Sequence, residues 1–163
     1  MSNYLTKIIE SKQEYLKSHQ LEIREKPESV RKKKLSFTER VRNKSTLGII
    51  AEFKRSSPSL GVINHSVNPT VMAGKYVNGG ADGISILTDE VYFNGHIRDL
   101  EAVATEVEVP VLCKDFIIEP IQINLAYQAG AGMILLIVRV LEKDKLHTLY
   151  QHAIRLGLEV LLE

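Results

Sequence analysis

Short apolar runs alternate with helix-like segments along most of this chain. The runs predict strands at residues 48–53, 83–87, 111–113, 133–138 and 158–163. The segments between them predict helices at residues 69–78, 95–106, 120–128 and 142–156. Strands that are apolar without alternation are typical of a sheet covered on both faces. The pattern therefore predicts an α/β fold with a parallel sheet, either an open doubly wound sheet or a (β/α)8 barrel.

Charged side chains stand at the carboxyl ends of several predicted strands. They are Glu52, Lys54, Asp89, Lys114, Asp115 and Glu163. Function that is spread over several strand ends is typical of a (β/α)8 barrel. The first strand is not followed by a G-x-G-x-x-G motif, and the chain carries no Walker A motif, so nucleotide binding is not favoured. We therefore expect the barrel rather than the open sheet.

The first 46 residues follow a different pattern. Residues 3–19 predict a helix, with Leu5, Ile8, Ile9, Lys12, Tyr15 and Leu16 near one face. Pro27 interrupts the chain, and residues 37–43 predict a second short helix with Ser36 as its N-cap and Glu39 as the reciprocating residue. The sequence thus predicts an N-terminal helical extension at 1–46 and a barrel portion at 47–163.

Composition excludes several classes of protein. The net charge of +1 gives no overall attraction to nucleic acid or to an acidic membrane, and we interpret the basic run at residues 31–34 as a solvated stretch. No apolar run approaches the roughly 18 residues that a membrane span needs, and the N-terminus lacks a signal-peptide core. Cys113 is the single cysteine, so no intramolecular disulfide can form and a reducing, cytoplasmic location is expected.

Five stretches of the chain resemble the indole-3-glycerol phosphate synthase family, in the family's order and spacing. They are IIAEFKRSSPSLG at 49–61, GGADGISILTDEVYFNG at 79–95, PVLCKDFIIE at 110–119, AGAGMILLIV at 129–138 and GLEVLLE at 157–163. The predicted N-terminal helices fit the extension that precedes the barrel in that family. A complete barrel has about 250 residues. The resemblance therefore predicts the N-terminal portion of a synthase, a partial barrel of five parallel strands that lacks the last three βα units.

The resemblance implies a reaction and a set of residues. The family closes the indole ring of 1-(2-carboxyphenylamino)-1-deoxyribulose 5-phosphate with loss of CO2 and water, without a metal or an organic cofactor. It implies that Lys114 is the general acid and Glu163 the general base, and that Lys54 contacts a substrate anion while Glu52 orients it. It also implies substrate contacts from Ser57 in a loop, from Phe93 and Phe116 around the anthranilate ring, and more weakly from Leu135.

Each of these residues also has a simpler interpretation. Glu52 and Lys54 share one strand face and can form a rim salt bridge without catalytic function. The two phenylalanines can be plain core residues, and Leu135 can simply fill the barrel. Cys113 has the opposite parity to Lys114, so we expect it to face the helices as a core residue.

Other polar residues are not expected to take part in the chemistry. For Asp89 and Asp115 we expect hydrogen bonds within loops. Two histidines, His65 and His96, are isolated in predicted loops, while His19, His147 and His152 lie on predicted helices. Because His147 and His152 are poorly spaced for joint ligation on one helix, no metal site is expected.

Two further hypotheses remain beside an active synthase. Barrel phosphate sites usually come from the loops after strands seven and eight, so this chain alone is expected to be inactive or very weak. A non-catalytic partial barrel that self-associates through its open edges is the alternative. The phosphoribosylanthranilate isomerase family is disfavoured, because it implies a catalytic cysteine at the end of the first strand, where this chain has Glu52 and Lys54.

Overall fold

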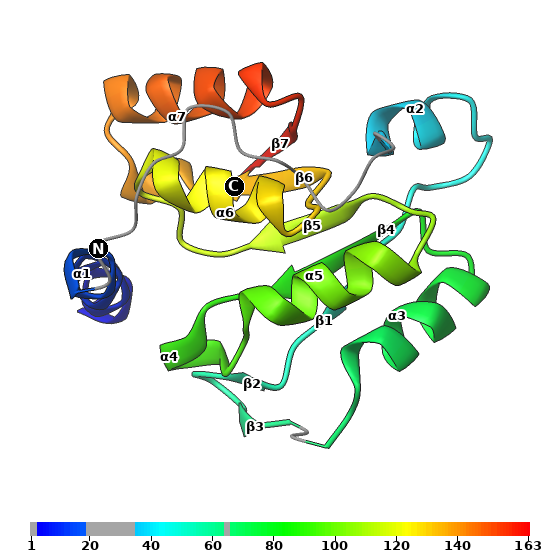
Figure 1. The fold of residues 1–163 in the computed structure, drawn as a ribbon, viewed down its shortest axis with the longest axis horizontal. Helices are drawn as coiled ribbons and strands as arrows, with labels where there is room; N and C mark the ends of the chain where they lie inside the picture. Colours follow the sequence, from blue (N-terminus) through cyan, green and yellow to red (C-terminus); the bar gives the residue numbers. More distant parts are fainter. Residues whose placement is uncertain (1–2, 19–34, 64–65) are drawn as a thin grey trace.

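A single parallel sheet organises the molecule in the computed structural model, which describes residues 3–18, 35–63 and 66–163 (Figure 1). Its strands are β1 (Ile50–Phe53), β4 (Gly83–Leu87), β5 (Val111–Lys114), β6 (Met133–Leu136) and β7 (Glu159–Leu162). They lie in the order β1-β4-β5-β6-β7, and every neighbouring pair is parallel. The strand order follows the chain order without reversal, which is the topology of a partial (β/α) barrel and confirms the predicted fold class.

Four helices cover one face of this sheet (Figure 1). They are α3 (Pro69–Asn78), α5 (Ile97–Glu106), α6 (Pro120–Gln128) and α7 (Lys143–Arg155). Side chains from alternate strand positions, such as Ile84, Ile86 and Ile134, pack with Leu100, Val103, Ile123 and Leu149 from the helices, and all of these are fully buried. Gly80 and Gly130 adopt positive φ angles of 96° and 87° where a helix turns into the next strand.

The other face of the sheet carries a smaller apolar cluster. Leu112 and Leu135 are each 2% exposed, because Phe37, Ile50 and Ile137 pack against them. The inner face of the central strands is therefore covered by side chains from α2, from β1 and from the segment after β6. Among the strands of this sheet, exposed apolar side chains lie on the edge strand β7, where Leu161 is 42% exposed and Leu162 is 53% exposed.

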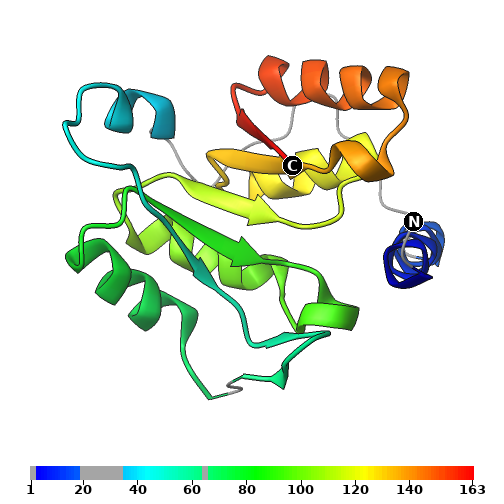
Figure 2. The ribbon, with the colours of Figure 1, turned by 180° about the vertical axis from the view of Figure 1, so that it is seen from behind.

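The two N-terminal helices pack at opposite ends of the sheet (Figure 2). Helix α1 (Asn3–Ser18) lies at the carboxyl ends of the strands, and α2 (Phe37–Arg42) lies at the amino ends. Ser36 is the N-cap of α2, as predicted, and its Oγ accepts a hydrogen bond of 3.0 Å from the Glu39 amide. The Ser36 hydroxyl also donates to Glu159 at the start of β7, at 2.7 Å, so α2 is tied directly to the sheet.

Several local features differ from the sequence prediction. β6 ends at Leu136 rather than at residue 138, and a 3-10 turn, η1 (Val138–Val140), follows it. The polar turn after β1 is a small hairpin of β2 (Ser56–Ser57) and β3 (Gly61–Val62). A short helix that we did not predict, α4 (Glu90–Phe93), follows β4 because the Asp89 carboxylate caps it.

Some predictions fall outside the described residues. These concern His19, Pro27, the basic run at 31–34 and His65. Among the helices in the described ranges, none is long and apolar enough to cross a membrane.

Candidate active site

A cleft of about 450 Å³ opens at the carboxyl ends of the strands, within the size range of small-molecule sites. Its walls are Leu5, Glu52, Lys54, Leu87, Phe93, Lys114, Asp115, Phe116, Leu135, Ile137, Arg139 and Glu163. These residues come from α1, β1, β4, α4, β5, β6, η1 and the end of β7. Seven of the eight predicted site residues line this cleft, although they lie far apart along the chain.

Four charged side chains form a connected group within the cleft. The Glu52 carboxylate lies 2.8 Å from Lys54 Nζ and 3.5 Å from Lys114 Nζ. Lys114 Nζ also lies 3.9 Å from Glu163 Oε2. The Lys114 side chain is 32% exposed and that of Glu163 is 64% exposed, so a small molecule can reach both. Lys114 therefore stands between two carboxylates from strands on opposite sides of it, a position suited to exchanging protons with a bound molecule.

Two aromatic rings form an apolar wall beside these charges. The centroids of Phe93 and Phe116 are 6.2 Å apart, and their planes are tilted by 38°. Both side chains are half-buried, while Leu135 is almost fully buried beneath the cleft. Rings at this separation contact each other. An aromatic ligand would therefore stack on their open side, or enter between them only if one ring turned away.

Ser57 is the predicted site residue that does not line this cleft. It lies in a neighbouring hollow of about 500 Å³ that shares Leu5, Lys54 and Phe93 with the cleft. Ser57 Oγ accepts a hydrogen bond of 3.2 Å from the Leu60 amide, within the small hairpin that follows β1. The hydroxyl thus stabilises the hairpin, and Lys54 of the charged group lines the same hollow.

The strand that carries Glu52 and Lys54 is anchored just beyond them. Arg55 forms a bidentate ion pair with Asp99 of α5, in which Nη2 lies 2.9 Å from Asp99 Oδ1. Its guanidinium carbon lies 5.3 Å from the centroid of the Phe53 ring. The hydrogen bonds that Arg55 donates to Asp99 raise the pKa of Arg55 above its ordinary value, although burial opposes this. This anchor fixes the end of β1, and with it the direction of the Lys54 side chain.

Cys113 lies on the face opposite to Lys114, as predicted. It packs in the core between sheet and helices and is 3% exposed. Burial raises the pKa of its thiol to about 12, so the thiol stays protonated and unreactive in the folded protein. The prediction of a core residue rather than a nucleophile is confirmed.

The predicted loop hydrogen bonds of Asp89 and Asp115 are also confirmed. Asp89 accepts from the Tyr92 amide at 2.8 Å, and Asp115 accepts from the Phe116 amide at 2.7 Å. Both carboxylates also bind Lys12 of α1, which sequence reasoning had placed only on an apolar helix face. The sequence does contain a signal for this contact, because Lys12 is a lone lysine among apolar positions of a helix face. A lysine that is buried at such a position needs anionic partners.

Five cleft residues were not predicted as site residues, namely Leu5, Leu87, Asp115, Ile137 and Arg139, and the first and last of them are the most informative. Leu5 comes from α1, and nothing in the sequence shows where that helix docks. Arg139 lies on η1, in a segment whose beginning we took for the end of a strand, and it adds a third cation to the cleft beside Lys54 and Lys114. Across the described ranges, no group of three or more His, Cys, Asp or Glu side chains has the arrangement of a metal site.

Comparison with solved structures supports the barrel fold. Dihydropteroate synthase from Xanthomonas albilineans in complex with 7,8-dihydropteroate aligns with a TM-score of 0.51 and 16% identity, over 71% of this chain and 45% of that protein. A dihydropteroate synthetase crystallised with a product aligns with a TM-score of 0.50 and 17% identity. At these identities the likeness concerns the fold alone.

Comparison with curated sequences gives a closer relationship. Indole-3-glycerol phosphate synthase of Listeria monocytogenes serotype 4a is 50% identical over 134 residues, which is 82% of this chain and 53% of the relative. The enzyme of the same name from Exiguobacterium sibiricum is 53% identical over 117 residues. That of Bacillus mycoides is 42% identical over all 163 residues, and the match covers 62% of that relative. The chain thus spans about half the length of the curated relatives it matches.

A family model described as indole-3-glycerol phosphate synthase matches residues 5–163. The match includes α1 and the strands that carry the charged group of the cleft. The chain therefore belongs to the indole-3-glycerol phosphate synthase family.

Proposed function

We propose that this chain carries the N-terminal part of an indole-3-glycerol phosphate synthase active site, acting in tryptophan biosynthesis as a carboxy-lyase. The substrate would be 1-(2-carboxyphenylamino)-1-deoxyribulose 5-phosphate. The main support is the position of Lys114, with Glu52 at 3.5 Å and Glu163 at 3.9 Å, beside the Phe93–Phe116 wall. The family match also supports the proposal, because it covers all the residues that line this cleft.

The first chemical step needs a proton donor at the ribulose carbonyl. A bond forms between that carbonyl carbon and the ring carbon that bears the carboxylate, and the carbonyl oxygen takes up a proton to become a hydroxyl. We assign this proton to the Lys114 ammonium. CO2 then leaves, and the electron pair of the broken carbon–carbon bond restores the aromatic ring. A correctly placed general acid contributes roughly 10²- to 10⁴-fold to such a step.

The second step removes water. The new hydroxyl leaves with a proton from an acid, and a proton is taken from the carbon next to nitrogen to complete the indole. We propose Glu163 as the base for this proton. Its 3.9 Å separation from Lys114 lets the proton that Glu163 takes up pass to the neutral Lys114 amine after turnover, while the second proton that the reaction consumes comes from solvent. Glu52, which bonds to Lys54 at 2.8 Å, is proposed to orient that lysine toward a substrate anion.

The substrate carries two anionic groups, a carboxylate and a phosphate. Lys54 and Arg139 are the cations proposed to contact them within this cleft, with Ser57 joining after a movement of its hairpin. In (β/α)8 barrels, phosphate is usually held by the loops after strands seven and eight. Because the match covers only about half of the length of the curated relatives, we propose that this chain alone binds the substrate weakly and turns it over very slowly or not at all.

The test is formation of the fluorescent indole product. The chain is assayed alone and after co-refolding with the last three βα units of the Listeria relative, with Lys114→Met as the test variant. Lys75→Met, at an exposed position on α3, is the matched control. We expect turnover in the mixture, unchanged in the control and reduced at least about 100-fold in Lys114→Met. A folded mixture without turnover, or full activity of Lys114→Met, would refute the assignment.

Self-association of a non-catalytic partial barrel is the second candidate. It is favoured by the two edge strands, β1 and β7, and by the exposed Leu161 and Leu162 on β7. Unpaired edges can join two copies through backbone hydrogen bonds. Light scattering decides the matter, since a mass of about 18.3 kDa in dilute solution excludes this candidate.

We propose that the protein is located in the cytoplasm. The buried single cysteine agrees with a reducing compartment.

A further inference from the structure

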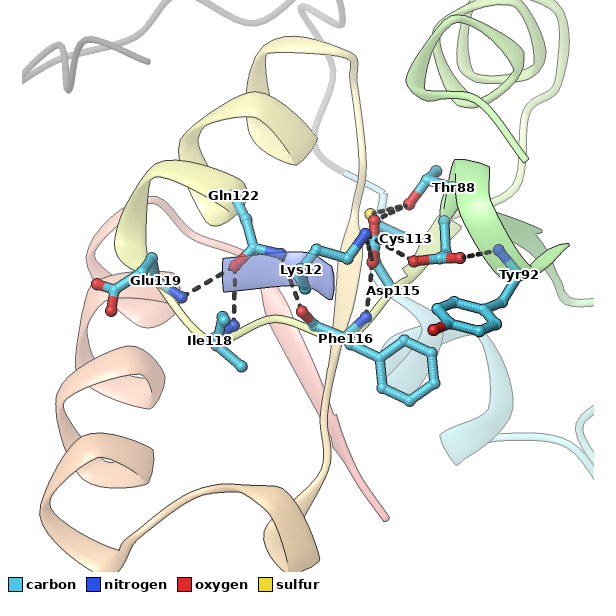
Figure 3. A network of polar contacts seen from close by, with 10 residues as sticks. Lys12, Thr88, Tyr92, Cys113, Asp115, Phe116, Ile118, Glu119 and Gln122 are labelled. Carbon is cyan, nitrogen blue, oxygen red and sulfur yellow. Dashed lines mark hydrogen bonds and ion pairs between the residues drawn. The ribbon is translucent and has the colours of Figure 1, made fainter. Parts of the chain in front are cut away.

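Lys12 is a buried lysine that belongs to no proposed chemical step. It lies on α1, its residue is 9% exposed, and its Nζ is 2.8 Å from Asp89 Oδ2 and 2.8 Å from Asp115 Oδ1. The two carboxylates follow β4 and β5, so one ammonium group joins three elements of the fold. Figure 3 shows Lys12 pointing toward Asp115 beside the residues that this carboxylate contacts.

The Asp89 carboxylate has a second role that leads to the cleft. Its Oδ1 accepts a hydrogen bond from the Tyr92 amide and thereby caps α4. The residue after Tyr92 is Phe93, whose ring forms half of the aromatic wall. Helix α4 has only four residues, and this cap fixes its first turn. The position of Phe93 therefore depends on the carboxylate that Lys12 holds.

The Asp115 carboxylate acts in the same way on the other half of the wall. It accepts from the Phe116 amide at 2.7 Å and from Thr88 Oγ1 at 2.8 Å. The carbonyl of Phe116 is held from the other side, because it accepts a hydrogen bond of 2.9 Å from Gln122 Nε2 (Figure 3). The backbone on either side of the Phe116 side chain is thus fixed, and one of the two anchors is again a partner of Lys12.

We propose that Lys12 is a positioning residue of the active site, which sets the aromatic wall by holding Asp89 and Asp115 together. One cation between two carboxylates keeps α4 and the loop after β5 at a fixed separation, and with them Phe93 and Phe116. The same lysine fastens α1, whose Leu5 lines the cleft and whose Tyr4 packs edge-on against Tyr92 at 5.7 Å. That this wall receives the aryl ring of the substrate rests on the proposed function.

The charges around Lys12 explain why the positions of Asp89 and Asp115 should change when the Lys12 ammonium is removed. Burial alone would lower the pKa of Lys12, but the charges of Asp115 and Asp89 outweigh burial and raise its pKa. The ammonium is therefore present at every pH below its ordinary value of 10.5. Without it, two carboxylates that shared one nitrogen would face each other, and like charges at short range repel.

Other ionisable groups near Lys12 must be separated from this effect. The centroid of the Tyr15 ring lies 5.8 Å from Lys12 Nζ. Both residues line a small cavity beside α1, and Cys113 lines it as well. Burial raises the pKa of Tyr15 and that of Cys113, so neither ionises near neutrality. Glu90 is on the exposed rim of this cavity, and its Oε1 lies 3.6 Å from His96 Nε2. Because histidine ionises near neutrality, the pH comparison below is made in a His96→Gln background.

The experiment is 19F NMR of the chain labelled with 4-fluorophenylalanine, which needs no substrate. The sequence has four phenylalanines, Phe37, Phe53, Phe93 and Phe116, and each signal is assigned by a Phe→Leu replacement. The test variant is Lys12→Met, with Lys12→Arg as the conservative rescue. The control is Lys7→Met, at an exposed position on the same helix. Because turnover is not measured, failure of the proposed function would leave this result unaffected.

We expect Lys12→Met to shift or broaden the signals of Phe93 and Phe116 and to leave those of Phe37 and Phe53 unchanged. Lys12→Arg and Lys7→Met should keep the native spectrum. Stepwise acidification of folded Lys12→Met should return the shifted signals toward their native positions, because protonation of one carboxylate of the close pair removes the repulsion. The chain with Lys12 should show no such change over the same range.

Three results would overturn the proposal. They are unchanged Phe93 and Phe116 signals in Lys12→Met, equal shifts of all four signals in a folded variant, and a selective shift that ignores pH. If Lys12→Met does not fold, the milder Asp89→Asn and Asp115→Asn variants decide. The first should move mainly the Phe93 signal and the second mainly the Phe116 signal, and native positions in both would again overturn the proposal.

Discussion

Lys114 on β5 lies 3.5 Å from Glu52 on β1, although β4 separates the two strands. Strands two places apart in a flat sheet are roughly 10 Å apart, so their side chains meet only when they are long and the sheet is curved. The register supplies the alignment, because Glu52 pairs with Ser85, and Ser85 with Leu112, two residues before Lys114. The ion pair is thus a consequence of barrel curvature, and the chemistry proposed for the cleft depends on it.

Glu52→Gln should separate catalysis from folding. The substitution removes the charge between Lys54 and Lys114 while keeping the shape of the side chain. We expect the rate of indole formation in the co-refolded mixture to fall by about 100-fold or more, with little change in stability. Glu101→Gln, at an exposed position on α5, should retain full activity. Equal rates in both variants would show that the Glu52 pair is a rim salt bridge only.

Asp82 should contribute to stability in a pH-dependent way. This buried carboxylate binds Lys44 and accepts a 3.0 Å hydrogen bond from the Ile49 amide, and both contacts lower its pKa below 3.8. A lowered folded pKa means that the stabilisation is complete above about pH 3.8 and is lost as the pH falls through the folded value. Asp82→Asn should reduce the free energy of unfolding at pH 7 by about 1–3 kcal/mol.

Urea unfolding at several pH values measures this effect. The difference in the free energy of unfolding between the native chain and Asp82→Asn should become smaller as the solution is made more acidic than about pH 3.8. The exposed Glu106→Gln variant provides the baseline for general acid effects. A gap that is constant over the whole range would mean that packing, rather than the charge of Asp82, is responsible.

Ser36 and Glu159 should be energetically coupled. Glu159 accepts from the Ser36 hydroxyl and from the Phe37 amide, each at 2.7 Å, and so holds α2 against β7. Partial burial opposes the ionisation of Glu159, but hydrogen bonds from Thr38, Ser36 and the Phe37 amide outweigh it and lower its pKa. A double-mutant cycle of Ser36→Ala and Glu159→Gln should give a coupling of at least about 0.5 kcal/mol. Simple additivity of the two changes would argue against the link.

Cys113 should report on unfolding. Because burial raises the pKa of its thiol to about 12, a thiolate is nearly absent at pH 8 in the folded chain. We expect labelling by a disulfide reagent at pH 8 to be slow and to follow the global unfolding rate as urea is added. Thr88→Val removes the neighbouring hydroxyl, 3.4 Å from the sulfur, and should not speed the reaction. Rapid labelling without denaturant would show that the core opens locally at β5.

Local pattern in the sequence determined most of the secondary structure. The helix at Pro69–Asn78 and the strand at Gly83–Leu87 agree with the prediction residue for residue, because their boundaries are marked by proline and glycine. Alternation along β5 correctly separated Lys114, in the cleft, from Cys113, in the core. Helix α4 was not predicted, because the residues after its capping residue Asp89 do not show a helical spacing of apolar side chains.

The sequence by itself therefore determined the five main strands, the helices between them and the faces that their side chains occupy, because these features depend on near neighbours in the chain. Only the tertiary structure decided where α1 docks, that Lys12 joins Asp89 to Asp115, and that Arg139 reaches the cleft. It also decided that the Ser57 hydroxyl bonds within its own hairpin. These features depend on distances between elements that are remote in sequence, and no local periodicity encodes such distances.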